Sequence, residues 1–188
     1  MTESITLPPP TRSRATGNFL LRRWPTAVAI GLEIVSWGIG PERAGQILPL
    51  LPALYVVAAV IRKRGASWPI LIASAALLFL LQLQTWVQPT IAILALATAV
   101  AVVGLFREPG RAELLVQTGG LVLFGGLALI GLTVTPDAAR YVLTVGWFGH
   151  GVWDLVHLRR NAVVSRSYAE WCGVLDVLIA AELLLGSQ

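Results

Sequence analysis

Charged residues are scarce in this sequence. Asp, Glu, Lys and Arg make up 13% of its 188 residues, whereas an average soluble domain carries roughly 25%, and the mean hydropathy is +0.74. A soluble globular fold is therefore close to excluded, and so is a disordered chain, because disorder requires low hydrophobicity and high charge. Cysteine is nearly absent as well. Cys172 stands alone, so neither an internal disulfide nor a paired-cysteine zinc site can form.

Long apolar runs fill most of the remaining sequence. A membrane helix needs roughly 17 to 25 largely apolar residues, and prolines and glycines mark the junctions between such runs. Period-2 alternation, which would indicate a barrel, is missing. We therefore predict an all-α, polytopic membrane helix bundle: a basic, proline-rich cytoplasmic tail (1–23, with no cleaved signal peptide) and one transmembrane domain (24–188). Its seven predicted spans are about 24–40, 45–61, 68–86, 89–106, 114–134, 138–158 and 168–186.

Basic residues alternate between the two sides of these predicted spans. Cytoplasmic loops of membrane proteins carry an excess of Lys and Arg, and here the tail and every second loop hold nearly all of them. This distribution predicts a cytoplasmic N-terminus and an extracytoplasmic C-terminus in the plasma membrane, the inner membrane of a bacterial cell. Arg43 and Arg140 lie on the outer side, and the remaining twelve of the 14 basic residues lie inside: Arg12, Arg14, Arg22, Arg23, Arg62, Lys63, Arg64, Arg107, Arg111, Arg159, Arg160 and Arg166.

A few ionisable residues lie within the predicted spans, where each costs about 2.5 to 3.5 kcal/mol at the helix centre. They are Glu33 in the first span, His150 and Asp154 in the sixth, and Asp176 in the seventh. With His157, the sixth span places three such groups at i, i+4 and i+7, on one helix face. At 1.5 Å per residue, Glu33, His150 and Asp176 all lie roughly 12 to 14 Å from the inner boundary. We expect these three groups to share one polar site.

Four interpretations of this polar site stay open. It is a structural knot that fixes helix packing, an acid–base site for a lipid-soluble substrate, a proton relay in a transporter, or a metal site. A metal held by all three sixth-span residues is disfavoured, because they extend over about 10 Å of helix. A pair such as His150 and Asp154, completed by Asp176 or Glu33, would fit better. Among the four interpretations we do not favour the metal site, and we expect neither a metal ion nor a cofactor.

Other polar and aromatic residues have expected roles that follow from their positions. His157, beside two arginines, is predicted to contact lipid headgroups, and Glu182 to reach water at the outer end of its span. We interpret Cys172 as a small buried hydrophobe. Indole faces attract positive charge, so Trp37, Trp147 and Trp153 are the candidates for binding a substrate that becomes cationic.

The first predicted span resembles a known family of membrane enzymes. The segment from Ala27 to Trp37, AVAIGLEIVSW, followed by Pro41, is similar to the early Trp-Glu helix of membrane-embedded meroterpenoid and indole-diterpene cyclases, which are small seven-helix enzymes. The resemblance implies that Glu33 is an acid that protonates an olefin or epoxide, together with an aspartate near the C-terminus, either Asp154 or Asp176. Leu32 departs from the tryptophan that the family carries at that position.

The expected function follows from the cluster and the resemblance together. We predict an intramembrane acid–base enzyme for an isoprenoid or other lipid substrate, with Glu33, His150, Asp154 and Asp176 as catalytic candidates. The expected partners are the bilayer and such a substrate, and no nucleic acid, because the basic residues do not form a single patch. The alternatives are a small-solute or proton-coupled transporter and a non-catalytic membrane subunit.

Overall fold

The computed structural model describes residues 23–107 and 110–186, and within these ranges every regular element is helical. The predicted cytoplasmic tail lies, apart from Arg23, outside the described residues. The elements are α2 (Trp24–Ser36), α3 (Pro41–Ile47), α4 (Leu50–Ile61), the 3-10 helix η1 (Arg64–Ala66), α5 (Ser67–Gln82), α6 (Pro89–Leu105), α7 (Arg111–Thr133), α8 (Pro136–Arg160) and α9 (Arg166–Leu185).

Local sequence signals account for most of the helix boundaries. Pro41, Pro89 and Pro136 begin α3, α6 and α8, where the missing proline N–H has no intrahelical partner to lose. The side chains of Gln88 and Ser165 cap α6 and α9 by accepting hydrogen bonds from the backbone. With α3 and α4 taken as one apolar segment, seven helical segments follow the seven predicted ranges, and the prediction of an all-α fold is confirmed.

Three boundaries differ from the prediction by four residues, among them the end of α5, which lies at Gln82 rather than near residue 86. The first helix, α2, ends at Ser36 and has only 13 residues, about 20 Å of helix, and residues 37–40 continue without helical structure. The second segment begins at Pro41 rather than near residue 45, and it is interrupted between Ile47 and Leu50. Pro49 explains the interruption, because proline cannot donate the backbone hydrogen bond that a continuous helix requires.

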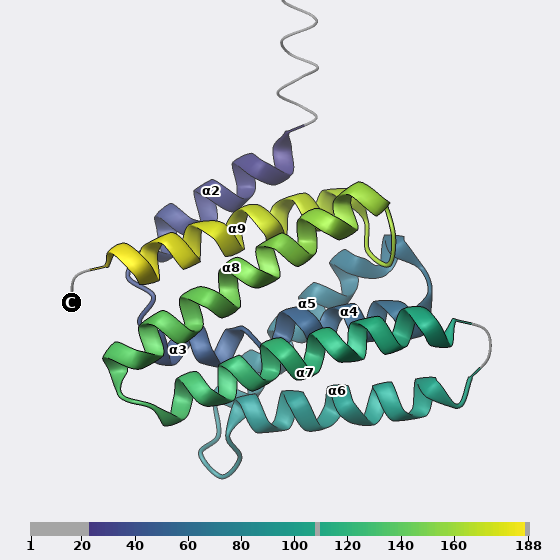
Figure 1. Ribbon diagram of the computed structural model, residues 1–188, viewed down its shortest axis with the longest axis horizontal. Helices are drawn as coiled ribbons and strands as arrows, with labels where there is room; N and C mark the ends of the chain where they lie inside the picture. Colours follow the sequence, from purple (N-terminus) through teal and green to yellow (C-terminus); the bar gives the residue numbers. More distant parts are fainter. Residues whose placement is uncertain (1–22, 108–109, 187–188) are drawn as a thin grey trace, which may run out of the picture.

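The helices form a bundle in which most of the helix axes run roughly along the long axis of the molecule (Figure 1). Helices α8 and α9 lie side by side along their length and form the most extensive helix pair, and α2 packs against α9. On the other side, α7 packs against α8 and α6 packs against α7. The segment α3–α4 contacts α6, α7 and, through α3, α8. It is the most buried of the long apolar segments and holds the centre of the core.

Successive helical segments run in alternating directions. The connections between α4 and α5, α6 and α7, and α8 and α9 lie at one end of the bundle, at the right of Figure 1, and the start of α2 lies toward that end. The connections between α5 and α6 and between α7 and α8 lie at the opposite end, as does the end of α9. The basic residues of the described loops therefore gather at one end of the molecule.

Three segments are long and apolar enough to cross a membrane: Pro41–Ile61, Arg64–Gln82 and Arg111–Thr133. Helices α2 and α6 are shorter apolar helices, whereas α8 and α9 are 25 and 20 residues long but contain more polar residues. Large hydrophobic side chains are exposed on the bundle, among them Val35, Phe79, Val122 and Val145. An apolar surface of this extent indicates contact with lipid or with other protein.

Candidate functional site

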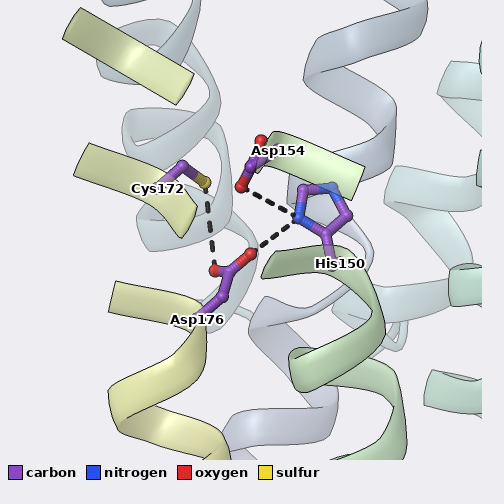
Figure 2. Close-up of side chains that lie close together, drawn as sticks. All are labelled: His150, Asp154, Cys172 and Asp176. Atoms are coloured by element: carbon purple, nitrogen blue, oxygen red, sulfur yellow. Dashed lines mark hydrogen bonds and ion pairs between the residues drawn. The ribbon is translucent and has the colours of Figure 1, made fainter. Parts of the chain in front are cut away.

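Four buried side chains from α8 and α9 form the densest polar cluster among the described residues (Figure 2). His150 Nδ1 lies 2.7 Å from Asp176 Oδ2 and 3.4 Å from Asp154 Oδ2. Cys172 Sγ lies 3.9 Å from Asp176 Oδ1. None of the four side chains is measurably exposed. We call these residues, His150, Asp154, Cys172 and Asp176, the α8–α9 cluster.

Two matched spacings create the α8–α9 cluster. His150 and Asp154 are four residues apart on α8, and Cys172 and Asp176 are four residues apart on α9, so each pair lies on one helix face. Gly151 lets the helices approach, because a Cβ added there would lie 3.3 Å from both Asp176 Cβ and the carbonyl oxygen of Gly173. Of the three groups predicted to share one polar site, His150 and Asp176 lie together, with Asp154 beside them. Glu33 is not among these residues, so that part of the prediction is wrong.

Aromatic residues from neighbouring helices surround the α8–α9 cluster. Tyr55 on α4 donates its hydroxyl hydrogen to Asp154 Oδ1, and the ring of Phe124 on α7 meets that of His150 edge-on, with 5.0 Å between the centroids. Asp154 Oδ2 and His150 Nε2 have no hydrogen-bond partner among the described residues. Neighbouring helices therefore hold the cluster in place, and these two buried atoms could each form one further bond.

His157 does not lie at the bundle surface, so its predicted headgroup contact is wrong. The side chain is buried, and its Nδ1 lies 2.9 Å from the carbonyl oxygen of Trp153, to which it donates. Its Nε2 lies 3.0 Å from Gln117 Nε2, which also donates to Glu113. The sequence places His157 beside two arginines but does not reveal Gln117, which comes from a different helix.

Glu33 lies apart from the α8–α9 cluster, and its partner is Glu182. Both side chains are buried and their carboxyl groups lie near each other, and Glu182 Oε1 accepts from the backbone N–H of Gly38 at 2.8 Å. The prediction that Glu182 reaches water is therefore wrong. Two ionised carboxylates that lie near each other away from water would repel, so this arrangement favours a proton on one of them. We call Glu33 and Glu182 the carboxyl pair.

A cleft of about 520 Å³ runs between α5 on one side and α2, α4 and α9 on the other. Leu54, Leu71, Leu78, Leu175 and Ile179 are among its mainly apolar lining residues. Because α5 packs chiefly on α4, the space between α5 and the pair α2–α9 is not filled. The cleft is suited to an extended apolar ligand.

The two ends of the cleft differ. At one end, ring contacts from Trp68 to Trp24 and to Trp171, with centroids 5.4 and 5.5 Å apart, join α5 to α2 and α9. The other end reaches Gly38 and Arg43, and Gly38 has a φ of +95°, which favours glycine. The N–H that Gly38 donates to Glu182 thus joins this end of the cleft directly to the carboxyl pair.

The three predicted substrate-binding tryptophans have different surroundings. Trp37 and Trp147 line the cleft; Trp37 is exposed, whereas Trp147 is buried and donates from Nε1 to the carbonyl oxygen of Ala44. Trp153 instead packs against Phe124 and His157 and is not among the residues that line the cleft. Sequence reasoning missed Trp171, which lines the cleft and has a buried Nε1 without a partner among the described residues.

Comparison of the chain with protein-family models, with curated proteins and with solved structures gives no match.

Proposed function

We propose that this chain is a seven-span plasma-membrane protein with a cytoplasmic N-terminus and an extracytoplasmic C-terminus. The exposed apolar surface supports this arrangement, as does the gathering of basic loops at one end of the bundle, which follows the positive-inside pattern. In this arrangement the short helix α2 crosses together with residues 37–40, since extended chain rises about 3.3 Å per residue.

Cysteine labelling tests the orientation. We expect Asp137→Cys, in the exposed first turn of α8, to react with a membrane-impermeant maleimide on intact cells, whereas Lys63→Cys reacts only after permeabilisation. The wild type serves as the unlabelled control, because Cys172 is completely buried. The opposite accessibility of the two engineered cysteines would show that the orientation is inverted.

The function that the geometry supports best is an intramembrane acid–base enzyme that acts on an isoprenoid or other unsaturated lipid. One observation carries this proposal: the apolar cleft ends at Gly38, whose N–H is bonded to Glu182 of the buried carboxyl pair, which lies directly behind this end of the cleft without lining it. A proton donor beside a water-poor apolar cleft is the arrangement that protonation of a carbon–carbon double bond requires.

The proposed cycle balances without any further reactant. The protonated carboxyl group of Glu33 or Glu182 transfers its proton to an alkene carbon, which leaves a carboxylate and a carbocation. The indole faces of Trp37 and Trp147, which line the cleft, stabilise the cation. Loss of a proton from another carbon of the rearranged cation to the carboxylate then restores the acid.

In this mechanism the α8–α9 cluster has a supporting role. Its members do not line the cleft. They lie behind Tyr168, a lining residue whose hydroxyl oxygen accepts from Cys172 Sγ at 3.5 Å. His150, Asp154 and Asp176 are therefore positioning residues, which hold α8 and α9 together and fix the wall of the cleft.

A retained ligand is the first test of the cleft. We expect native mass spectrometry of the protein in mild detergent to reveal a bound isoprenoid or lipid, and Ala75→Trp, which fills the cleft, to reduce its occupancy at least tenfold. Ala73→Trp is the matched control, because Ala73 is exposed on the same helix and does not line the cleft. Equal ligand loss in both variants, or no loss in either, would contradict the assignment of the cleft.

A proton-coupled transporter is the second candidate, and one observation favours it. The chain from Glu113 through Gln117 to His157 begins near the start of α7, at the basic end of the bundle, and leads into its interior. Release of the bound lipid chemically unchanged, together with proton uptake by vesicles that contain the protein, would favour this function over the enzyme.

A further inference from the structure

We propose that the α8–α9 cluster is a binding site for one divalent transition-metal ion, with zinc as the best match. The site is formed by His150 Nδ1, Cys172 Sγ and one carboxylate oxygen each from Asp154 and Asp176. This inference does not rest on catalysis in the cleft, because none of these residues lines the cleft.

The four ligand atoms are already gathered. They all lie within 4.8 Å of one another. A tetrahedral zinc ion with bonds of about 2.0 to 2.3 Å separates its ligand atoms by about 3.3 to 3.8 Å. Cys172 Sγ lies 3.9 Å from Asp176 Oδ1, and His150 Nδ1 lies 3.4 Å from Asp154 Oδ2. The 2.7 Å approach of His150 to Asp176 must widen to admit the ion, and any separation near the 4.8 Å limit must narrow.

The chemistry of the donors also matches zinc. Zinc accepts mixed donor sets such as this one, which has one imidazole nitrogen, one thiolate and two carboxylate oxygens. Ions that bind only oxygen ligands, such as Mg²⁺, would not use the sulfur. Asp154 Oδ2 has no hydrogen-bond partner among the described residues although it is buried and directed at His150. A metal ion would satisfy this oxygen.

The surroundings resemble the supporting shell of a metal site. Tyr55 holds Asp154 through its other carboxylate oxygen, and such outer partners fix the orientation of metal ligands. A pocket of about 410 Å³ beside α2 is lined by Gly151 and Gly173, where α8 and α9 approach each other next to the cluster. Bound there, the metal would link the two helices.

Cobalt binding tests this inference on the full-length protein. After chelator treatment and buffer exchange, we expect the wild type to bind about one equivalent of Co²⁺ with a thiolate-to-cobalt charge-transfer band, and to release it to Zn²⁺. Cys172→Ser should lose the charge-transfer band, and Tyr55→Phe should weaken binding by about 10- to 100-fold. Glu182→Gln, which changes a buried carboxyl group elsewhere on α9, is the control and should bind normally.

Each outcome decides the matter. Stoichiometric zinc in protein purified without chelator, lost in Asp176→Asn, would support the site. Wild-type protein without the charge-transfer band would overturn it, and would leave the cluster as a purely polar contact. Binding that is unchanged by Cys172→Ser and Asp176→Asn would identify an adventitious ion only. Because ligand occupancy of the cleft is measured separately, failure here leaves the proposed function standing.

Discussion

Asp176→Ala is expected to lower the free energy of unfolding by about 3 to 5 kcal/mol, the cost of removing one partner from a buried ion pair. His150 would keep only the longer contact to Asp154, 3.4 Å away, in surroundings that exclude water. A single hydrogen bond between membrane helices contributes only about 0.6 kcal/mol on average. A loss of about 3 to 5 kcal/mol would therefore indicate an ion pair, and a loss below about 1 kcal/mol would indicate an ordinary hydrogen bond. SDS titration of chelator-treated protein in mixed micelles, followed by tryptophan fluorescence, measures the change.

Two further variants isolate the cause of that loss. Asp137→Ala removes an exposed aspartate from the first turn of α8 and should cost no more than about 1 kcal/mol. The double variant His150→Leu, Asp176→Leu should be more stable than Asp176→Ala, because it removes the imidazole left without Asp176, while Asp154 keeps its hydrogen bond from Tyr55. If the double variant is the less stable protein, the cluster does not act as a charged pair.

Glu33→Gln and Glu182→Gln are each expected to abolish turnover while the protein stays folded. The amide has nearly the shape of the acid and can both donate and accept hydrogen bonds, so we expect the free energy of unfolding to change by no more than about 1 kcal/mol. It cannot donate a proton to carbon, and loss of a general acid lowers turnover by about 100- to 10,000-fold. Product formation from lipid held in detergent or vesicles measures the effect.

Controls for the carboxyl pair come from the same chain. Glu42→Gln changes an exposed glutamate on α3 and should leave turnover unchanged. The double variant Glu33→Gln, Glu182→Gln should lose no more activity than the more damaging single variant, because the two residues act as one unit. Strictly multiplicative losses would show that the two carboxyl groups act independently.

The helical segments could be predicted from the sequence because the signals are local. Prolines at positions 41, 89 and 136 begin helices, and apolar runs of suitable length lie between them. The early end of α2 could not be predicted in this way. The apolar pattern continues through Trp37 to Ile39. The backbone nevertheless leaves the helix there, where Gly38 donates a hydrogen bond to Glu182, a residue distant in sequence.

The α8–α9 cluster was predictable in part for the same reason. A spacing of four residues places His150 above Asp154 on one face, and the short connection between α8 and α9 makes their adjacency expected. Glu182 as the partner of Glu33 was not predictable. Counting residues from the inner boundary estimates the depth of a Cα atom, whereas two glutamate side chains reach several ångströms along their helices and toward each other.

The most direct test of the account is turnover in D2O. Wild-type protein is incubated with geranylgeranyl lipids in deuterated buffer, and the recovered lipids are analysed by mass spectrometry. We predict products that carry deuterium on carbon, formed by the wild type and by Ala73→Trp but not by Glu33→Gln or Ala75→Trp. Lipid that binds in the cleft and is recovered without deuterium on carbon would contradict acid catalysis, and would make the protein a carrier rather than an enzyme.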